Sequence, residues 1–421
     1  MNKRQFLKTM GLSAISAPVF SREFENAITQ HKETEPLKLA KNEDFWAKIR
    51  KDYKLNPDFI NLENGYYCIT PVPIKEAFFK NVEECNLLGS YYMRNSRFPD
   101  NERVRKALAE VVGCDFEELV ITRNATESLD TVISGYDWKP GDEAIMAEQD
   151  YPSMLQHFEL MARRYGIKNV VLSVPNHPEN DEEIVKMYEA AITPKTRLLM
   201  VCHIINITGQ ILPIKKITEM AHLHGVDVLV DGAHAVGHFE YEISELGCDY
   251  YGSSLHKWLS APLGVGLLYV KKDKIKNLWP IYGDTGFADT DIRKLNHTGT
   301  PAVHTDLSLL NAIDYLKMIR IQRKEARLRY LREYWSDRLK DVPNVVINTP
   351  YSGKTACGIG NVGLKNMKPG ILAERLLNEH KIWTVGIDGQ GVHGCRITPN
   401  IYTSTAELDI FVNAIKKLGN S

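Results

Sequence analysis

The chain has 421 residues, with 52 Lys and Arg against 53 Asp and Glu, which gives a formal net charge of −1. The length suggests about two or three domains, and a hydrophobic content of 43% is enough to form folded cores. Balanced charge disfavours a dedicated nucleic-acid binder, which normally presents a basic surface. No run of about 18 uncharged apolar residues occurs, so no transmembrane helix is expected. The seven cysteines form no C-x-x-C pair, which disfavours a zinc or dithiol site.

Residues 1–21 have the layout of an export signal. Lys3 and Arg4 precede a mildly apolar stretch that runs from Met10 to Phe20, the order found in secretory signals. The basic run also resembles a twin-arginine signal, with Lys3 in place of the first arginine. The sequence therefore predicts export to the periplasm, with a cytoplasmic location as the alternative.

From residue 22 to about 55 the chain is charged, and a surface helix is expected near residues 44–51. Beyond Phe59, short apolar runs alternate with amphipathic stretches, which predicts a largely parallel sheet covered by helices on both faces. The predicted strands are 119–122, 143–147, 170–174, 198–203, 226–231 and 265–270, and the predicted helices are 101–112, 154–165, 182–191 and 213–224.

After Pro301 the pattern changes. A long polar helix is expected over residues 306–339, followed by short strands and two helices over 370–380 and 405–418. This order of helices and short strands predicts a smaller α+β domain. The expected organisation is therefore a leader over 22–55, a large domain over 56–300 and a small domain over 301–421.

The residues after two neighbouring strands suggest a catalytic site, because ligands of open parallel sheets bind beyond the carboxyl ends of the strands. The buried run 226–231 ends in Asp231, whose carboxylate can pair with a protonated ring nitrogen. Lys257 follows the next strand, flanked by His256 and Trp258. A desolvated lysine suits Schiff-base chemistry, because its pKa must fall before the amine can attack a carbonyl.

With this spacing, Asp231 and Lys257 resemble the signature of pyridoxal-phosphate (PLP) enzymes of fold type I. The chain is similar to the class V aminotransferase and cysteine desulfurase superfamily, and within it to the isopenicillin N epimerase-like group, over about residues 55–418. The resemblance implies an α/β fold with a mostly parallel seven-stranded sheet in the large domain. It also implies PLP as the cofactor and a homodimer with shared active sites.

The resemblance implies roles for individual residues. Lys257 forms the Schiff base, Asp231 pairs with the pyridine nitrogen and His234 hydrogen-bonds the phenolic oxygen. The other implied cofactor contacts are Ala125, Thr126, Ser254 and His256 at the phosphate, Tyr151 on the ring face, Asn206 near the phenolic oxygen and Thr300 at the phosphate of the neighbouring subunit.

Arg396 matches the residue that clamps a substrate carboxylate, and guanidinium–carboxylate pairing suits an α-amino acid. Asn64, in the Asn64–Gly65 turn, and Arg94 are further candidates for contact with the substrate. The sequence leaves open whether the reaction is transamination, epimerisation, elimination or decarboxylation.

Three other kinds of protein share some of these sequence features. A C–S lyase or desulfurase-like enzyme fits the same motifs, but the segment 383–395 has no cysteine where a desulfurase nucleophile is expected, and Cys395 directly precedes Arg396. A non-catalytic binding protein on this fold is disfavoured because Asp231 and Lys257 are both present. A dinucleotide oxidoreductase is disfavoured because no G-x-G-x-x-G follows the first strand.

Overall fold

The computed structural model describes residues 20–283, 286–351 and 353–420. Its central feature is a seven-stranded sheet with the strand order β2-β8-β7-β6-β5-β3-β4. Strand β8 is antiparallel to both of its neighbours, and the other pairs are parallel, so the expected mostly parallel sheet is confirmed. The strands are β2 (Leu119–Thr122), β3 (Glu143–Ala147), β4 (Lys168–Leu172), β5 (Thr196–Cys202), β6 (Asp227–Asp231), β7 (Tyr250–Ser254) and β8 (Gly266–Val270).

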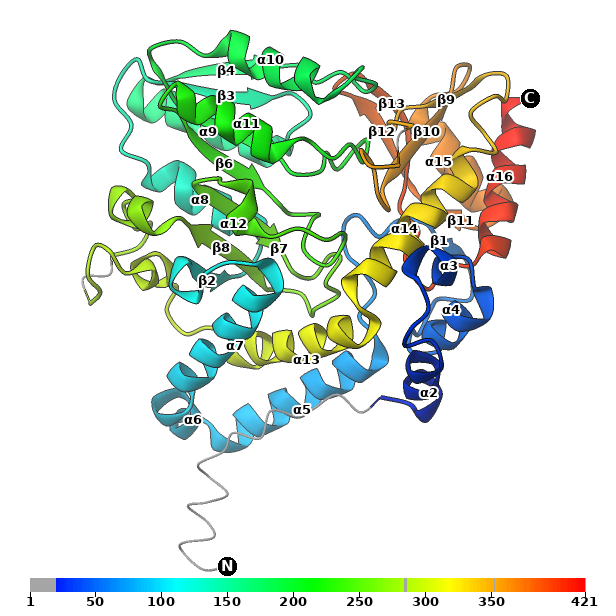
Figure 1. Cartoon of the computed structure of the whole chain (residues 1–421), viewed down its shortest axis with the longest axis horizontal. Helices are drawn as coiled ribbons and strands as arrows, with labels where there is room; N and C mark the ends of the chain where they lie inside the picture. The colour runs from blue at the N-terminus through cyan, green and yellow to red at the C-terminus, as the bar shows by residue number, and fades with distance from the viewer. Residues whose placement is uncertain (1–19, 284–285, 352, 421) are drawn as a thin grey trace, which may run out of the picture.

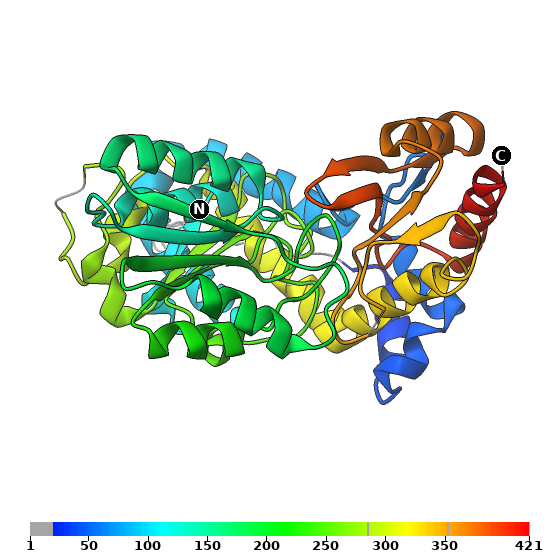
Figure 2. The same cartoon turned by 90° about the horizontal axis from the view of Figure 1, so that it is seen from above.

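Alternate side chains of these strands enter two separate cores, which is why helices cover both faces of the sheet (Figure 2). On β5, Leu199 and Val201 belong to one core, and Leu198 and Met200 belong to the other. Helices α8 (Ala125–Gly135) and α9 (Pro152–Tyr165) contribute to the second core. The first core takes residues of α7 (Arg97–Val112), α10 (Asp181–Ala191) and α11 (Ile214–Leu223).

A second unit contains the antiparallel sheet β12-β13-β10-β9 (Figure 1). Its elements are β9 (Val345–Ile347), β10 (Gly360–Leu364), β12 (Val385–Gly389) and β13 (Val392–Ile397), with helices α15 (Pro369–His380) and α16 (Thr405–Gly419). Near it lies a separate parallel pair, β1 (Ile60–Asn61) with β11 (Ile382–Trp383). Residues just after β1 are thereby brought beside the C-terminal unit.

Helices α13 (Val303–Ile319) and α14 (Ile321–Ser336) replace the single long helix that the sequence predicts over 306–339. That prediction is wrong because the chain turns at Arg320, whose φ of 72° is outside the helical region. Helix α13 packs against α5 (Val72–Leu88) and α7, and α14 packs against the N-terminal helix α3 (Pro36–Ala40). The remaining described α-helices are α2 (Arg22–Gln30), α4 (Glu43–Arg50), α6 (Ser90–Asn95) and α12 (Ile243–Leu246).

Of the predicted export signal, residues 1–19 lie outside the described part of the chain. Among the helices that the structure describes, none combines the length and the apolar character needed to cross a bilayer. The described residues also include no group of three or more His, Cys, Asp or Glu side chains arranged to hold a metal ion.

Candidate active site

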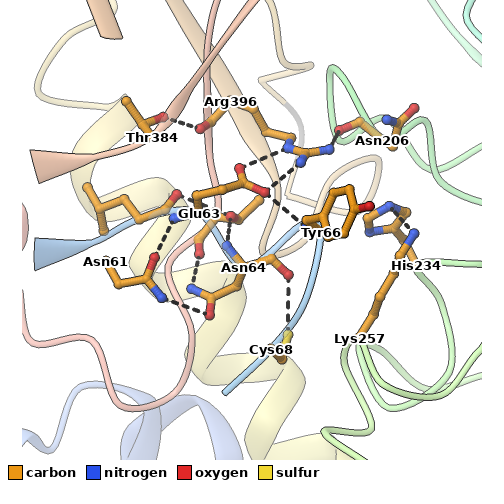
Figure 3. A network of polar contacts seen from close by, with 12 residues as sticks. Asn61, Glu63, Asn64, Tyr66, Cys68, Asn206, His234, Lys257, Thr384 and Arg396 are labelled. Carbon is orange, nitrogen blue, oxygen red and sulfur yellow. Dashed lines mark hydrogen bonds and ion pairs between the residues drawn. The ribbon is translucent and has the colours of Figure 1, made fainter. Parts of the chain in front are cut away.

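The predicted residues converge where the carboxyl ends of the central strands face the small C-terminal sheet. Asp231 ends β6, and His234 follows it in the next loop. Lys257 follows β7, and Arg396 comes from β13 of the other unit. Figure 3 shows Lys257 beside His234, with Arg396 approaching from the C-terminal unit and meeting the segment that follows β1.

Lys257 is partly buried. Its Nζ is 3.0 Å from Nε2 of His234. Burial lowers the pKa of Lys257 to about 8; the cation of Arg396 acts in the same direction, whereas Asp231 opposes the shift. About half of the amine is therefore unprotonated at pH 8 and about a tenth at pH 7, far more than for an ordinary lysine, and the unprotonated form can act as a nucleophile or a base.

His234 is held in one tautomer. The indole Nε1–H of Trp258 donates to its Nδ1 at 3.3 Å, and burial lowers the pKa of His234 well below its ordinary value. A neutral imidazole that accepts at Nδ1 carries its proton on Nε2. His234 therefore directs an N–H toward Lys257, whose unprotonated Nζ can accept it.

Trp258 is itself fixed from two sides. The ring of His238 stacks on its indole, with 3.8 Å between ring centroids and 15° between planes. The buried ammonium-bearing side chain of Lys324, from α14, donates to the carbonyl oxygen of Trp258. The sequence reasoning gave no role to Trp258 or Lys324, because their contacts join segments far apart in the chain.

Asp231 is suited to hold a cationic ring nitrogen. Its Oδ1 accepts from the N–H of Ala233 at 2.9 Å, and no partner for Oδ2 is found among the described residues. Burial raises the pKa of Asp231, while the Ala233 N–H and Lys257 act in the opposite direction. Asp150 is also buried, and desolvation with a contribution from Asp231 raises its pKa to about 7. This pocket would therefore be stabilised by an added positive charge, as a protonated pyridine supplies.

The predicted phosphate residues meet at the N-terminus of α8. The N–H of Ala125 donates to Oγ of Ser254 at 2.9 Å, and Thr126 is the next residue of the same first turn. Gly266 permits this close approach, because a Cβ there would lie 2.7 Å from Cα of Asn124. First-turn amides and a hydroxyl form an anion site, which fits the phosphate of PLP.

The other predicted cofactor residues are placed as follows. His256 is half-buried beside Lys257, and burial lowers its pKa to about 4. Tyr151 is 42% exposed at the start of α9, so its ring is open to a ligand. The carbonyl oxygen of Asn206 accepts from Nη1 of Arg396 at 3.4 Å. Thr300 is exposed and lines a cavity of about 780 Å³.

Arg396 is paired with a carboxylate of the chain itself. Its Nη2 donates to Oε1 of Glu63 at 2.5 Å, and its Nε donates to Oε2 at 3.1 Å. The two side chains are only 9% and 7% exposed. Glu63 directly precedes the Asn64–Gly65 turn, and no local sequence pattern links its charge to Arg396, which lies 333 positions away.

Of the other predicted substrate contacts, Asn64 lies next to Glu63 in the network around Arg396, whereas Arg94 lies on α6. Asn64 is fully buried, with Nδ2 donating to the carbonyl oxygen of Thr398 at 2.7 Å and Oδ1 accepting from Tyr402 at 2.6 Å. Its side chain therefore holds the turn against the C-terminal unit. Arg94 is exposed on α6, and within the described residues no hydrogen bond or ion pair joins it to Lys257 or Arg396.

None of the cysteines resembles an activated nucleophile. All seven are free thiols, and burial raises the pKa of each one. Cys395 is fully buried next to Arg396, and its pKa is raised to about 12. A persulfide-forming cysteine needs thiolate character and access to the substrate, and these thiols have neither.

Comparison with known proteins agrees with this geometry. The family model for Aminotransferase class-V matches residues 90–409. Isopenicillin N epimerase from Streptomyces clavuligerus is 28% identical over 399 residues, covering 89% of this chain and 98% of that protein. Among solved structures, a cysteine desulfurase from Thermococcus onnurineus superposes with a TM-score of 0.78 at 23% identity, covering 90% of this chain and 98% of that one.

A further solved structure, the cystine C–S lyase C-DES in complex with cysteine persulfide, has a TM-score of 0.76 at 24% identity and covers 86% of this chain and 98% of that one. The family match spans most of the chain, and the two structural matches show the same fold. The chain therefore belongs to the class V aminotransferase family and is a PLP-dependent enzyme of fold type I.

Proposed function

We propose that this enzyme acts on an α-amino acid at its Cα atom, with Lys257 as the group that removes and returns the Cα proton, and that the outcome is epimerisation. The observation that carries the proposal is the Lys257 amine, with its pKa near 8, facing His234 at 3.0 Å. The similarity to isopenicillin N epimerase along 89% of the chain supports the reaction type.

Each residue of the site contributes through its charge or its protonation state. PLP, when bound, withdraws electrons from the bonds at the substrate Cα. Asp231 keeps the ring nitrogen protonated, and the amides at the start of α8 neutralise the phosphate. Lys257, as a free amine, holds or releases a proton near its pKa. Arg396 supplies the cation for the substrate carboxylate.

Elimination of sulfur from a sulfur-containing amino acid is the second candidate. It uses the same Cα deprotonation but needs no cysteine nucleophile, so the high thiol pKa values do not oppose it. Persulfide transfer, as in a desulfurase, is disfavoured because the pKa values of these thiols are raised and the thiolate is the form that reacts.

Proton exchange tests the proposal. Full-length protein loaded with PLP is incubated in D₂O with a panel of L- and D-amino acids, and the Cα signals are followed by NMR together with chiral analysis of the products. Epimerisation predicts deuterium at Cα and the inverted amino acid. Release of ammonia and sulfide would identify the lyase, and keto acid without inversion would identify a transaminase.

A homodimer is part of the proposal. Thr300 lines the 780 Å³ cavity together with Arg123 and Glu127, which flank the first-turn residues Ala125 and Thr126 of α8. A second copy could supply its own Thr300 to this region. Light scattering of the purified full chain tests this: a mass of two chains is expected, and a monomer that retains full activity would refute it.

Export to the periplasm rests on the character of residues 1–21. Cell fractionation of the natural chain and of a Lys3→Gln/Arg4→Gln variant is the test. The natural chain is expected in the periplasmic fraction and the variant in the cytoplasm, whereas the same distribution for both would contradict the proposal.

A further inference from the structure

The carboxylate of Glu63 is paired with the guanidinium of Arg396, the group proposed to bind a substrate carboxylate. It takes the Nη2 and Nε atoms of the guanidinium, which form one of its two bidentate edges. The third nitrogen, Nη1, donates to the carbonyl oxygen of Asn206. All three nitrogens of Arg396 therefore already have an acceptor within the chain.

The local backbone holds this pair together. A Cβ on Gly65 would lie 2.6 Å from Cζ of Arg396, so the turn passes directly against the guanidinium, and a larger residue there would force the Arg396 side chain to shift. The N–H of Tyr66 also donates to Oε1 of Glu63 at 2.9 Å. Figure 3 shows Glu63, from the segment after β1, enclosed between Arg396 and this turn.

The charges of Glu63 and Arg396 affect how a substrate carboxylate can bind. Glu63 and Arg396 together carry no net charge, and both side chains are largely shielded from water. A substrate carboxylate placed at Arg396 while Glu63 remained there would face a like charge at short range in a medium of low dielectric. Tyr66, two positions beyond Asn64, is 79% exposed, so the turn that follows Glu63 borders solvent.

We propose that Glu63 is an internal competitor for the substrate clamp: it occupies Arg396 in the resting enzyme and is displaced when a ligand with a free carboxylate binds. An α-carboxylate can therefore bind at Arg396 only when the Glu63–Arg396 ion pair is broken. This inference rests on the proposed role of Arg396 as the carboxylate clamp.

Propionate, a carboxylate with no amine, is the probe, because it can bind the clamp without reacting with PLP. Its dissociation constant is measured by calorimetry on the full chain, with and without added PLP, for the wild type and for Glu63→Gln. Glu325→Gln is the matched control, since Glu325 also pairs with an arginine, Arg329, but on α14. Thermal unfolding checks that each variant is folded.

Removing the charge of Glu63 is expected to tighten propionate binding about tenfold, because a neutral amide competes less well than a carboxylate for a guanidinium. Glu325→Gln is expected to behave as the wild type, and Arg396→Ala in the Glu63→Gln background is expected to abolish the gain. Should Glu63→Gln fold poorly, Glu63→Asp serves in its place, because the shorter side chain weakens the pair and predicts a smaller tightening.

Equal or weaker propionate binding by the Glu63 variants, or no binding by any form, would overturn the inference and make Glu63 a residue that merely positions Arg396. The titration without PLP remains informative even when the cofactor fails to bind. A protein that takes up no PLP would therefore defeat the proposed function while the propionate result still decides the role of Glu63.

Discussion

At the scale of single residues, the site is organised around a neutral histidine and a lysine whose pKa is lowered toward neutral. The Nε2–H of His234 faces Nζ of Lys257 because Trp258 occupies the other ring nitrogen. Desolvation favours the neutral form of each group, and the two effects act together. The reactive, unprotonated form of the amine is therefore more abundant at a given pH than in an exposed lysine.

The lowered pKa of Lys257 predicts how cofactor uptake depends on pH. A protonated amine cannot attack a carbonyl, so the rate of PLP uptake by the cofactor-free protein should rise with pH, with its midpoint at about 8. Stopped-flow absorbance at a series of pH values measures the midpoint. Arg396→Gln should move the midpoint upward, because it removes a cation that lowers the pKa of Lys257. A midpoint near the ordinary lysine value of about 10.4 would contradict the argument.

Replacing Trp258 with phenylalanine tests the tautomer of His234. Trp258→Phe keeps an aromatic ring against His238 but removes the N–H, so Nδ1 of His234 can take the proton. We expect about a tenfold lower kcat and a change in the ¹⁵N NMR tautomer signature of His234. Trp335→Phe is the matched control, because Trp335 is also fully buried but its Nε1 has no hydrogen-bond partner within the described chain. Equal effects of both substitutions would mean that Trp258 contributes only through packing.

Residues that follow strands could be predicted from the sequence, since the sheet itself brings strand ends together. Lys257 and His234 are in contact, and so are Ala125 and Ser254. The pairing of Glu63 with Arg396 could not be predicted, because it depends on β1 and the C-terminal sheet meeting across more than 300 positions of sequence. Local pattern carries no information about such a contact.

At the scale of elements, α14 links the N-terminal helices to the rest of the protein. Arg327 is fully buried on α14 and donates to the carbonyl oxygens of Ala40 and Thr403, each at 2.9 Å, as well as to Glu43 at 2.5 Å. An arginine can be buried here because its donors reach backbone carbonyls and a carboxylate.

The Arg327→Met substitution should lower the free energy of unfolding by about 3 kcal/mol, because it leaves buried acceptors unpaired. Chemical denaturation followed by fluorescence measures the change. Arg338→Met is the control, since Arg338 is exposed just beyond the same helix and should cost less than about 0.5 kcal/mol. Equal losses for the two variants would mean that the buried contacts of Arg327 do not stabilise the fold.

The elements themselves were predictable where the apolar pattern was strong. Residues 119–122 and 143–147 form strands with the predicted bounds, because continuous apolar runs are buried on both faces of the sheet. The break between α13 and α14 at Arg320 was missed, because no glycine or proline marks it. The turn at Arg320 lets α13 pack against α5 and α7 while α14 packs against α3.

At the scale of the whole molecule, the site exists only where the two units meet. The large sheet supplies Asp231, His234 and Lys257, while the C-terminal sheet supplies Arg396. The segment after β1 adds Glu63 through its pairing with the C-terminal unit. The fold class and the cofactor followed from motif resemblance, but the contacts between units required the three-dimensional structure.

The central claim is that Lys257, among the lysines of this chain, is the one that carries PLP. Lys324 is the strongest alternative candidate, because burial also lowers its pKa to about 8 and it contacts Trp258, the residue next to Lys257. Its amine, however, is engaged by the carbonyl oxygen of Trp258, whereas that of Lys257 faces His234.

Borohydride reduction of the PLP-loaded full chain, followed by mass mapping of its peptides, identifies the lysine that carries the cofactor. We expect the label on Lys257, loss of the visible absorbance of the bound cofactor in Lys257→Ala, and retention of that absorbance in Lys324→Met. A label on Lys324 or another lysine, or retained absorbance in Lys257→Ala, would show that Lys257 does not hold PLP.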